Sequence, residues 1–320
     1  MAREFKSMDG NNAAAYVSYA FTEVAGIYPI TPSSPMADLV DQWSAAGMKN
    51  IFGTTVKVCE MQSEGGAAGT VHGSLQSGAL TTTYTASQGL LLMIPNMYKI
   101  AGEMLPGVFH VSARTLSVHA LSIFGDHSDV MGGAADRVLP AGVLLAPGGD
   151  GPGGVAHLAA IHCRMPFLHF FDGFRTSHEI QKIQALDYDA LRPLVDMDAL
   201  KAFRAHSLNP EHPATRGTTV NPDIFFQCRE ACNQKFAAIP EAVEHYMAEI
   251  GKLTGRTHHL FDYYGAPDAE RVVILMGSAA ETARETVDYL TARGEKVGLI
   301  NVHLYRPFSA EHFLAAVPAS

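Results

Sequence analysis

The sequence predicts an α/β protein with an open, mainly parallel sheet flanked by helices. Short apolar segments alternate with helix-like segments almost from the start of the chain, which is the pattern of βαβ units. The 320 residues are 47% apolar and only 17% charged, which is enough for a large buried core. We expect one α/β domain over residues 1–255. Residues 256–320 are expected to begin a second, incomplete α/β domain, because their single βαβ unit at 272–302 does not make a stable sheet alone.

The N-terminal elements can be placed from their capping and turn residues. Asp9 is expected to cap a helix that ends before Gly26. Proline fixes φ and removes a donor, so the segment 28–35 predicts a rigid turn in which Ser34 caps the next helix and Pro35 is its first residue. The elements predicted after this turn are helices at 36–46, 60–78 and 88–101, a buried strand at 54–59, and strands at 79–85, 107–112, 138–145 and 166–171.

The predicted helix at 60–78 is unusually rich in small residues, with glycine at positions 65, 66, 69 and 73. Each glycine costs about 1 kcal/mol in a helix interior. A helix that accepts this cost repeatedly is expected to gain close approach to another backbone or to a flat ligand. After residue 186 the chain becomes more polar and helical up to 255, which predicts an excursion over the outer surface.

Composition excludes several classes of partner. The net charge of −9 gives no source for phosphate attraction, so we expect no nucleic-acid partner. No uncharged apolar run is long enough to span a membrane, and the N-terminus has no signal or transit character, so we expect a cytoplasmic protein without membrane contact. Four cysteines give neither a disulfide framework nor a C-x-x-C pair. Cys228 and Cys232 could share a helix face, but they are better explained as small hydrophobes than as ligands, and we predict no metal ligands in this chain.

Three polar residues lie where predicted strands or turns lead into helices. Thr31, in the proline-braced turn, could donate a hydrogen bond to a small polar substrate, or its turn could serve only to cap a helix. Glu64 has small neighbours that leave room for a ring, although it could also be a capping-box or solvated glutamate. Arg114 follows an apolar strand and is placed to grip a carboxylate through two hydrogen bonds, or to form a salt bridge to another loop.

Several longer stretches carry a family resemblance. They are YPITPSSPM at 28–36, QSEGGA at 62–67, SAR at 112–114, DHSD at 126–129, and the segments 167–179, 209–217 and 304–308. Taken together, the sequence resembles the amino-terminal part of pyruvate:ferredoxin (flavodoxin) oxidoreductase over nearly its whole length.

The resemblance implies a thiamine-diphosphate enzyme whose pyrimidine-binding domain is residues 1–255 and in which residues 256–320 begin a truncated, transketolase C-terminal-like domain. In that family, Glu64 would hydrogen-bond the aminopyrimidine ring nitrogen, Thr31 would meet the keto-acid oxygens and Arg114 would bind the substrate carboxylate. The complete enzyme, of EC 1.2.7 type, would convert pyruvate and coenzyme A to acetyl-CoA and CO2. It would pass electrons through [4Fe–4S] clusters to ferredoxin or flavodoxin. Thiamine diphosphate with Mg²⁺ would be shared with other domains, and we expect a homodimer.

The sequence departs from this family in two respects. It lacks the cysteine-rich cluster motifs and the Gly-Asp-Gly…Asn diphosphate site, since the next asparagine after Gly149-Asp150-Gly151 is Asn209. We therefore expect a fragment that is inactive without the remaining domains of the enzyme. The stretch 147–154 is rich in Gly and Pro, so it predicts a flexible loop and a shortened helix. Two alternatives stay open: a subunit of another 2-oxoacid:ferredoxin oxidoreductase, and a non-catalytic fragment that only associates with a partner.

Overall fold

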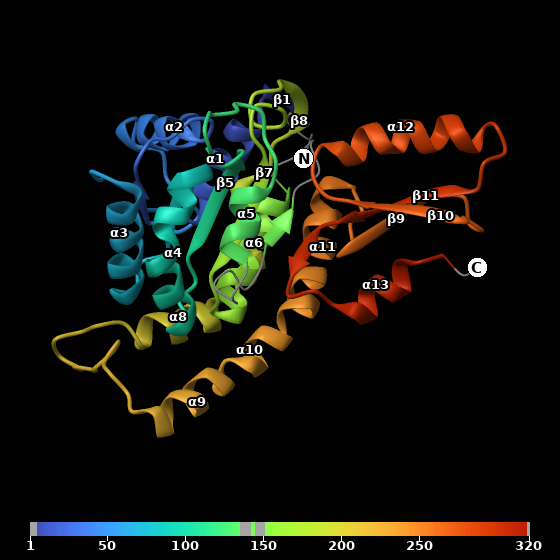
Figure 1. The fold of residues 1–320 in the computed structure, drawn as a ribbon. Helices are drawn as coiled ribbons and strands as arrows, with labels where there is room; N and C mark the ends of the chain where they lie inside the picture. Colours follow the sequence, from blue (N-terminus) through green and yellow to red (C-terminus); the bar gives the residue numbers. More distant parts are fainter. Residues whose placement is uncertain (1–4, 135–141, 145–150, 319–320) are drawn as a thin grey trace.

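The computed structural model describes residues 5–134, 142–144 and 151–318, and its main feature is a seven-stranded sheet (Figure 1). The strands are β2 (Val24–Ile27), β3 (Lys57–Glu60), β4 (Thr81–Thr85), β5 (Val108–Ala113), β6 (Gly142–Leu144), β7 (Phe167–Asp172) and β12 (Leu304–Arg306). They lie in the order β12-β6-β7-β5-β4-β2-β3. All neighbouring pairs run parallel except β12 and β6, which are antiparallel. The predicted open, mainly parallel sheet is confirmed.

Two groups of helices pack on this sheet. One group contains α1 (Gly10–Phe21), α2 (Ser34–Ala45) and α6 (Gly151–Cys163); the other contains α3 (Glu64–Gln76), α4 (Ser87–Gly102) and α5 (Ser128–Ala134). Every residue of β4 and β5 is buried, so both faces of the sheet centre are covered. Strands buried on both faces are typical of parallel sheets between helix layers.

The observed starts of three helices and the position of one strand can be compared with the predictions. Asp9 caps α1 as predicted, accepting a hydrogen bond from the Asn12 N–H at 2.8 Å. The N-cap of α2 is Ser33, one residue before the predicted Ser34. The predicted helix at 60–78 begins only at Glu64 because Ser63 caps it. The strand predicted as buried at 54–59 is β3, an edge strand with exposed ends.

The prediction of a flexible loop at 147–154 is wrong for the second half of this stretch. Residues 147–150 lie outside the described residues, but 151–154 form the first turn of α6 and not a flexible loop. Pro152 is the second residue of the helix, where its missing N–H costs no helical hydrogen bond. A Cβ on Gly153 would lie 2.6 Å from Cγ1 of Val17, so glycine here lets α6 pack closely on α1. Of the strand predicted at 138–145, the structure describes residues 142–144, which form β6; the others lie outside the described residues.

The region from 186 to 255 is helical, as predicted. It contains α7 (Tyr188–Leu191), a 3-10 turn (Arg192–Leu194), α8 (Met197–Ala205), α9 (Pro222–Ala231), α10 (Asn233–Ala237) and α11 (Ile239–Thr254). Helix α11 packs along α6, and the connection at 209–217 is exposed, apart from the half-buried Arg216. A short antiparallel pair of β1 (Phe5–Met8) and β8 (Gln181–Gln184) was not predicted.

A second, three-stranded sheet lies to the right of the first in Figure 1. Its strands are β9 (Phe261–Gly265), β10 (Arg271–Leu275) and β11 (Val297–Val302), with α12 (Ala279–Thr291) joining β10 to β11. This parallel pair is the βαβ unit that the sequence predicts, whereas β9 adds an antiparallel strand. The chain then returns to the first sheet as β12 before α13 (Ala310–Ala316), so the second sheet is connected to the first at both ends.

Candidate active site

The three predicted site residues lie at the carboxyl ends of the parallel strands in the seven-stranded sheet. Thr31 follows β2, Glu64 follows β3 and Arg114 directly follows β5. Ser87, at the start of α4, and Asp172, at the end of β7, lie at the carboxyl ends of the neighbouring strands. Because these strands run parallel, their carboxyl ends share an edge, which is where open α/β sheets bind ligands.

Thr31 and Arg114 are in direct contact. The Arg114 Nη1 donates a hydrogen bond to the Thr31 carbonyl oxygen at 2.6 Å, which joins the end of β5 to the turn after β2. Thr31 is exposed, whereas Arg114 is only 9% exposed and its Nε has no hydrogen-bond partner among the described residues. Burial lowers the pKa of the Arg114 guanidinium, and the nearby Asp129 carboxylate partly offsets this. The guanidinium therefore keeps donors that an anion can use.

Asp129, to which the sequence assigned no role, positions Arg114. Its fully buried carboxylate accepts hydrogen bonds from the backbone N–H groups of Arg114 at 3.0 Å, Ser87 at 2.8 Å and Val130 at 2.8 Å. Burial raises the pKa of Asp129 above its ordinary value even though these hydrogen bonds act to lower it. The carboxylate thus fixes the end of β5 to the starts of α4 and α5. Its one sequence signal was its place in the DHSD stretch.

Glu64 is a buried carboxylate beside the first turns of α4. It is 7% exposed, and no described residue donates a hydrogen bond to it. A Cβ on Gly89 would lie 2.8 Å from Glu64 Oε1 and 2.7 Å from Thr85 Oγ1, so this glycine leaves the space that the carboxylate occupies. Thr85 Oγ1, beside the same glycine, is fully buried without a partner among the described residues, whereas the Glu64 oxygens keep some access to solvent. The Glu64 carboxylate is therefore open to a ligand that donates a hydrogen bond.

Glu64 makes no direct hydrogen bond to Thr31 or Arg114. It is connected to them through α4: Gly89 contacts Glu64, and the N–H of Ser87, two residues earlier, binds the same Asp129 carboxylate as Arg114. The structure therefore brings Thr31 and Arg114 together and places Glu64 on the same edge.

His127 and Asp172 form a hydrogen-bonded pair at the carboxyl end of β7. His127 Nε2 lies 2.5 Å from Asp172 Oδ1, and the Ser278 N–H donates to Asp172 Oδ2 at 2.5 Å. Burial acts to lower the pKa of His127, but the hydrogen bond to Asp172 and the charges of three nearby carboxylates together outweigh it, and the pKa is raised. The pKa of Asp172 is lowered: burial acts against this, and the hydrogen bonds from His127 and Ser278 outweigh it. Because Ser278 immediately precedes α12, the pair fastens the edge to the second sheet.

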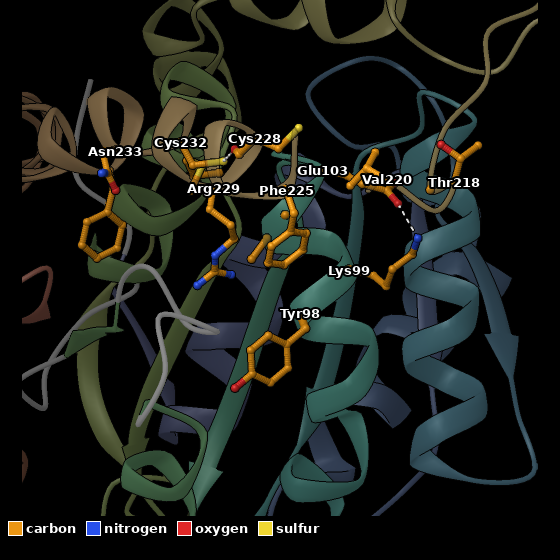
Figure 2. A pocket seen from close by; sticks show the side chains of 15 residues that line it. Tyr98, Lys99, Glu103, Thr218, Val220, Phe225, Cys228, Arg229, Cys232 and Asn233 are labelled. Atoms are coloured by element: carbon orange, nitrogen blue, oxygen red, sulfur yellow. Dashed lines mark hydrogen bonds and ion pairs between the residues drawn. The ribbon is translucent and has the colours of Figure 1, made fainter. Parts of the chain in front are cut away.

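A cavity of about 500 Å³ lies elsewhere, between the C-terminal end of α4 and α9 (Figure 2). Tyr98, Phe225 and Arg229 help to line it, together with both Cys228 and Cys232. Cys232 Sγ donates to the Cys228 carbonyl oxygen at 3.6 Å, and all four cysteines are free thiols. The cavity contains none of the three predicted site residues. Among the described residues, the group close enough to hold a metal ion is His258, Asp262 and His303.

Two family models match the chain. One, described as pyruvate flavodoxin/ferredoxin oxidoreductase, thiamine diphosphate-binding, matches residues 16–147 and 152–248. The other, described as pyruvate:ferredoxin oxidoreductase core domain II, matches residues 269–318. None of the described helices is both long and apolar enough to cross a membrane.

Curated relatives are similar over the whole chain. A pyruvate-flavodoxin oxidoreductase from Enterobacter agglomerans is 62% identical over 100% of this chain and 27% of its own length. A pyruvate:ferredoxin oxidoreductase from Moorella thermoacetica is 62% identical over 98% of this chain and again 27% of its own. The chain thus spans about a quarter of the length of these relatives.

The fold is also similar to a solved structure. A 2-oxoglutarate:ferredoxin oxidoreductase from Magnetococcus marinus, with 2-oxoglutarate, coenzyme A and succinyl-CoA bound, superposes with a TM-score of 0.71 at 17% identity. The match covers 98% of this chain and 56% of that one. At this identity the likeness concerns the fold alone.

Proposed function

Because this chain belongs to the pyruvate flavodoxin/ferredoxin oxidoreductase family, through its thiamine diphosphate-binding domain, we propose that it supplies the pyrimidine-binding part of such an enzyme. The complete enzyme would oxidise and decarboxylate pyruvate with coenzyme A, giving acetyl-CoA, CO2 and two electrons. Pyruvate is favoured over other 2-oxo acids because the relatives at 62% identity are named for it.

Glu64 is the residue whose surroundings fit the cofactor. When bound, thiamine diphosphate supplies the electron sink for decarboxylation. The largely buried Glu64 carboxylate would accept a hydrogen bond from the aminopyrimidine ring nitrogen when that nitrogen carries a proton. Gly89 keeps the space beside Oε1 free of a side chain. The diphosphate and Mg²⁺ would be held by other domains of the enzyme.

Thr31 and Arg114 would bind the 2-oxo acid. The exposed Thr31 would donate its hydroxyl hydrogen to the keto-acid oxygens, and the Arg114 guanidinium would donate to the substrate carboxylate. Asp129 would act as a positioning residue, since it fixes the backbone of Arg114.

Electron transfer would take place outside this chain. Its four cysteines form no cluster-binding run, so [4Fe–4S] clusters would be bound in the remaining domains and would pass electrons to ferredoxin or flavodoxin. We therefore propose that the chain is inactive alone and works within a cytoplasmic homodimer of the whole enzyme.

The role of Glu64 can be tested in the complete enzyme containing this chain. Glu64→Gln keeps the volume but removes the charge, so we expect pyruvate-dependent reduction of an electron-acceptor dye to fall at least about 100-fold. Glu60→Gln removes a similar charge from the exposed end of β3 and should leave the rate unchanged. Wild-type turnover in Glu64→Gln would refute the role given to Glu64.

A further inference from the structure

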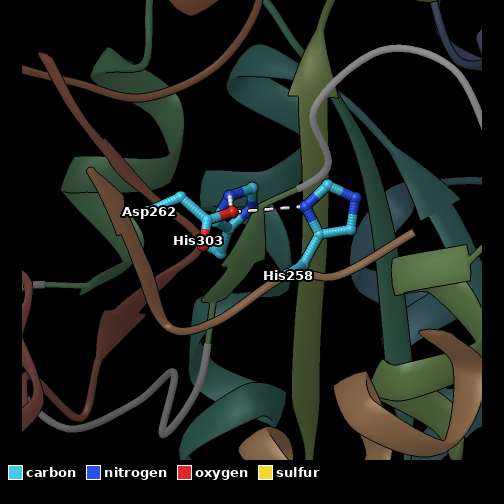
Figure 3. A group of neighbouring side chains, drawn as sticks. All are labelled: His258, Asp262 and His303. Atoms are coloured by element: carbon cyan, nitrogen blue, oxygen red, sulfur yellow. Dashed lines mark hydrogen bonds and ion pairs between the residues drawn. The ribbon is translucent and has the colours of Figure 1, made fainter. Parts of the chain in front are cut away.

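Three ligand-type side chains meet where the chain enters and leaves the second sheet. His258 lies in the connection from α11 to β9, Asp262 lies in β9, and His303 directly follows β11. Their ligand atoms all lie within 4.8 Å of one another, and Figure 3 shows both rings beside the Asp262 carboxylate. The cluster is distant in sequence from Thr31, Glu64 and Arg114, and it takes no part in the proposed reaction.

The distances in this cluster are close to those of a metal site. Asp262 Oδ2 lies 3.3 Å from His258 Nδ1 and 3.0 Å from His303 Nε2. In a tetrahedral zinc site with bonds of about 2.0–2.2 Å, neighbouring ligand atoms lie about 3.3–3.5 Å apart. Small side-chain movements would therefore open the cluster around an ion.

The buried side of the cluster has mismatched hydrogen bonds. His303 Nε2 faces both the Asp262 carboxylate and, at 3.2 Å, the Asn301 Nδ2 donor. A neutral imidazole nitrogen either donates or accepts, so Nε2 cannot satisfy both neighbours. Asn301 is 2% exposed, and its Oδ1 is buried without a partner. Turning the Asn301 amide by half a turn exchanges its nitrogen and oxygen, which directs the oxygen toward the same point.

With the amide turned, lone pairs from four side chains would face one point, which one cation could occupy. It would accept lone pairs from His258 Nδ1, Asp262 Oδ2, His303 Nε2 and the turned Asn301 Oδ1. Buried polar atoms without partners are costly, so a shared ion would stabilise the arrangement.

The remaining contacts of Asp262 hold its carboxylate in place. Its Oδ1 accepts a hydrogen bond from the His259 N–H at 3.0 Å, which is the kind of outer contact that orients metal ligands. The His259 side chain is engaged by Glu244, which leaves it outside the cluster.

We propose that His258, Asp262 and His303 bind a divalent cation of the zinc class, with the Asn301 amide oxygen or water as fourth ligand. Imidazole and carboxylate together favour zinc over Mg²⁺ or Ca²⁺, which prefer oxygen ligands alone. The ion would join the entry of β9 to the exit of β11, and so fasten the two connections between the sheets.

The test uses the metal-free 320-residue chain titrated with Zn²⁺ in a calorimeter. We expect one equivalent to bind and the melting temperature to rise with Zn²⁺ concentration. His258→Ala should weaken binding at least about 100-fold, because it removes one ligand from a part-exposed position. His259→Ala is the matched control on the neighbouring residue and should bind as the wild type does. Circular dichroism checks that both variants are folded.

Co²⁺ gives a second readout of the same site. A tetrahedral nitrogen and oxygen environment should give visible absorption with the wild type and His259→Ala, and none with Asp262→Asn, which keeps the volume of the side chain. Absence of one-to-one Zn²⁺ binding to the wild type would overturn the proposal. Equal Zn²⁺ affinities of His258→Ala and His259→Ala would overturn it too, as would unchanged Co²⁺ absorption in Asp262→Asn.

Discussion

Two groups of histidines in this molecule have opposite surroundings. His110, His157 and His169 lie buried inside the seven-stranded unit and bond to one another, with His110 Nδ1 2.7 Å from His169 Nδ1 and His110 Nε2 3.0 Å from His157 Nε2. No carboxylate of the described residues is bonded to them. His258 and His303, at the second sheet, share the charged carboxylate of Asp262.

The first group shows what burial does to a histidine that has no carboxylate beside it. Burial lowers the pKa of His110 well below its usual value, and it lowers that of His157 and His169 to about 3. At neutral pH these three rings are therefore uncharged and serve as core side chains. The second group instead places one carboxylate between two imidazole rings, and this set of donor atoms suits a cation.

The largest expected effect is that the first group of histidines makes the protein less stable at acid pH. A histidine whose pKa falls on folding binds more protons when unfolded, so its stabilising contribution is full above about pH 6.5 and is lost as pH falls toward the folded pKa. Each such group costs up to about 1.4 kcal/mol per pH unit. We expect the free energy of unfolding, measured with urea between pH 7 and 5, to fall steeply.

The variant His157→Phe isolates this effect, because it removes one titrating ring and keeps the stacking on Phe21. Its unfolding should take up about one proton fewer than that of the wild type over the same pH range. An identical pH slope in the two proteins would show that His157 is already charged in the folded state.

A smaller effect on stability is expected from the packing of α6 on α1, beside the buried histidines. Gly153→Ala would press a methyl group against Val17, beside the Cε1 atoms of His110 and His169 at 3.8 Å, and should lower the free energy of unfolding by about 1–3 kcal/mol. Gly73→Ala is the matched control in α3, where nothing lies within 4 Å, and it should be about 1 kcal/mol more stable than the wild type. Thermal melts of both variants check this. Equal changes would contradict the close packing of α6 on α1.

The smallest effect is expected beside the second group. The Glu244 hydrogen bond raises the pKa of His259, so the pair stabilises the fold below about pH 6.5, and this contribution is lost as pH rises through the raised value. Both side chains are accessible to solvent, so Glu244→Gln should cost less than about 1 kcal/mol at pH 6. An NMR titration should show the His259 pKa falling. An unchanged pKa would rule out Glu244 as its cause.

The parts of the fold that the sequence predicted depend on neighbours along the chain. Asp9 caps α1 through a residue three positions away, and the alternation of strands and helices is likewise local. The missed strands depend on distant partners: β1 pairs with β8, and β12 pairs with β6. The prediction of a flexible loop at Gly153 was wrong for the same reason. This glycine allows α6 to pack closely on Val17, which belongs to another helix.

The candidate site divides in a similar way. Thr31, Glu64 and Arg114 could be selected because each follows a strand or turn, and their roles stay predictions. Asp129 was missed because its role is to accept hydrogen bonds from backbone groups on other elements. His303 lies far along the chain from Asp262, so no sequence spacing marks the cluster they form.

The position of β12 also sets an order on synthesis. Since β6 receives this neighbour from residues 304–306, the nascent chain leaves the ribosome with one edge of its main sheet unpaired until nearly all of this segment has been translated. An open strand edge is a template for pairing with another chain. Translational pauses before residue 304 would therefore lengthen the period in which nascent chains can pair with one another, and a co-translational chaperone covering β6 would shorten it.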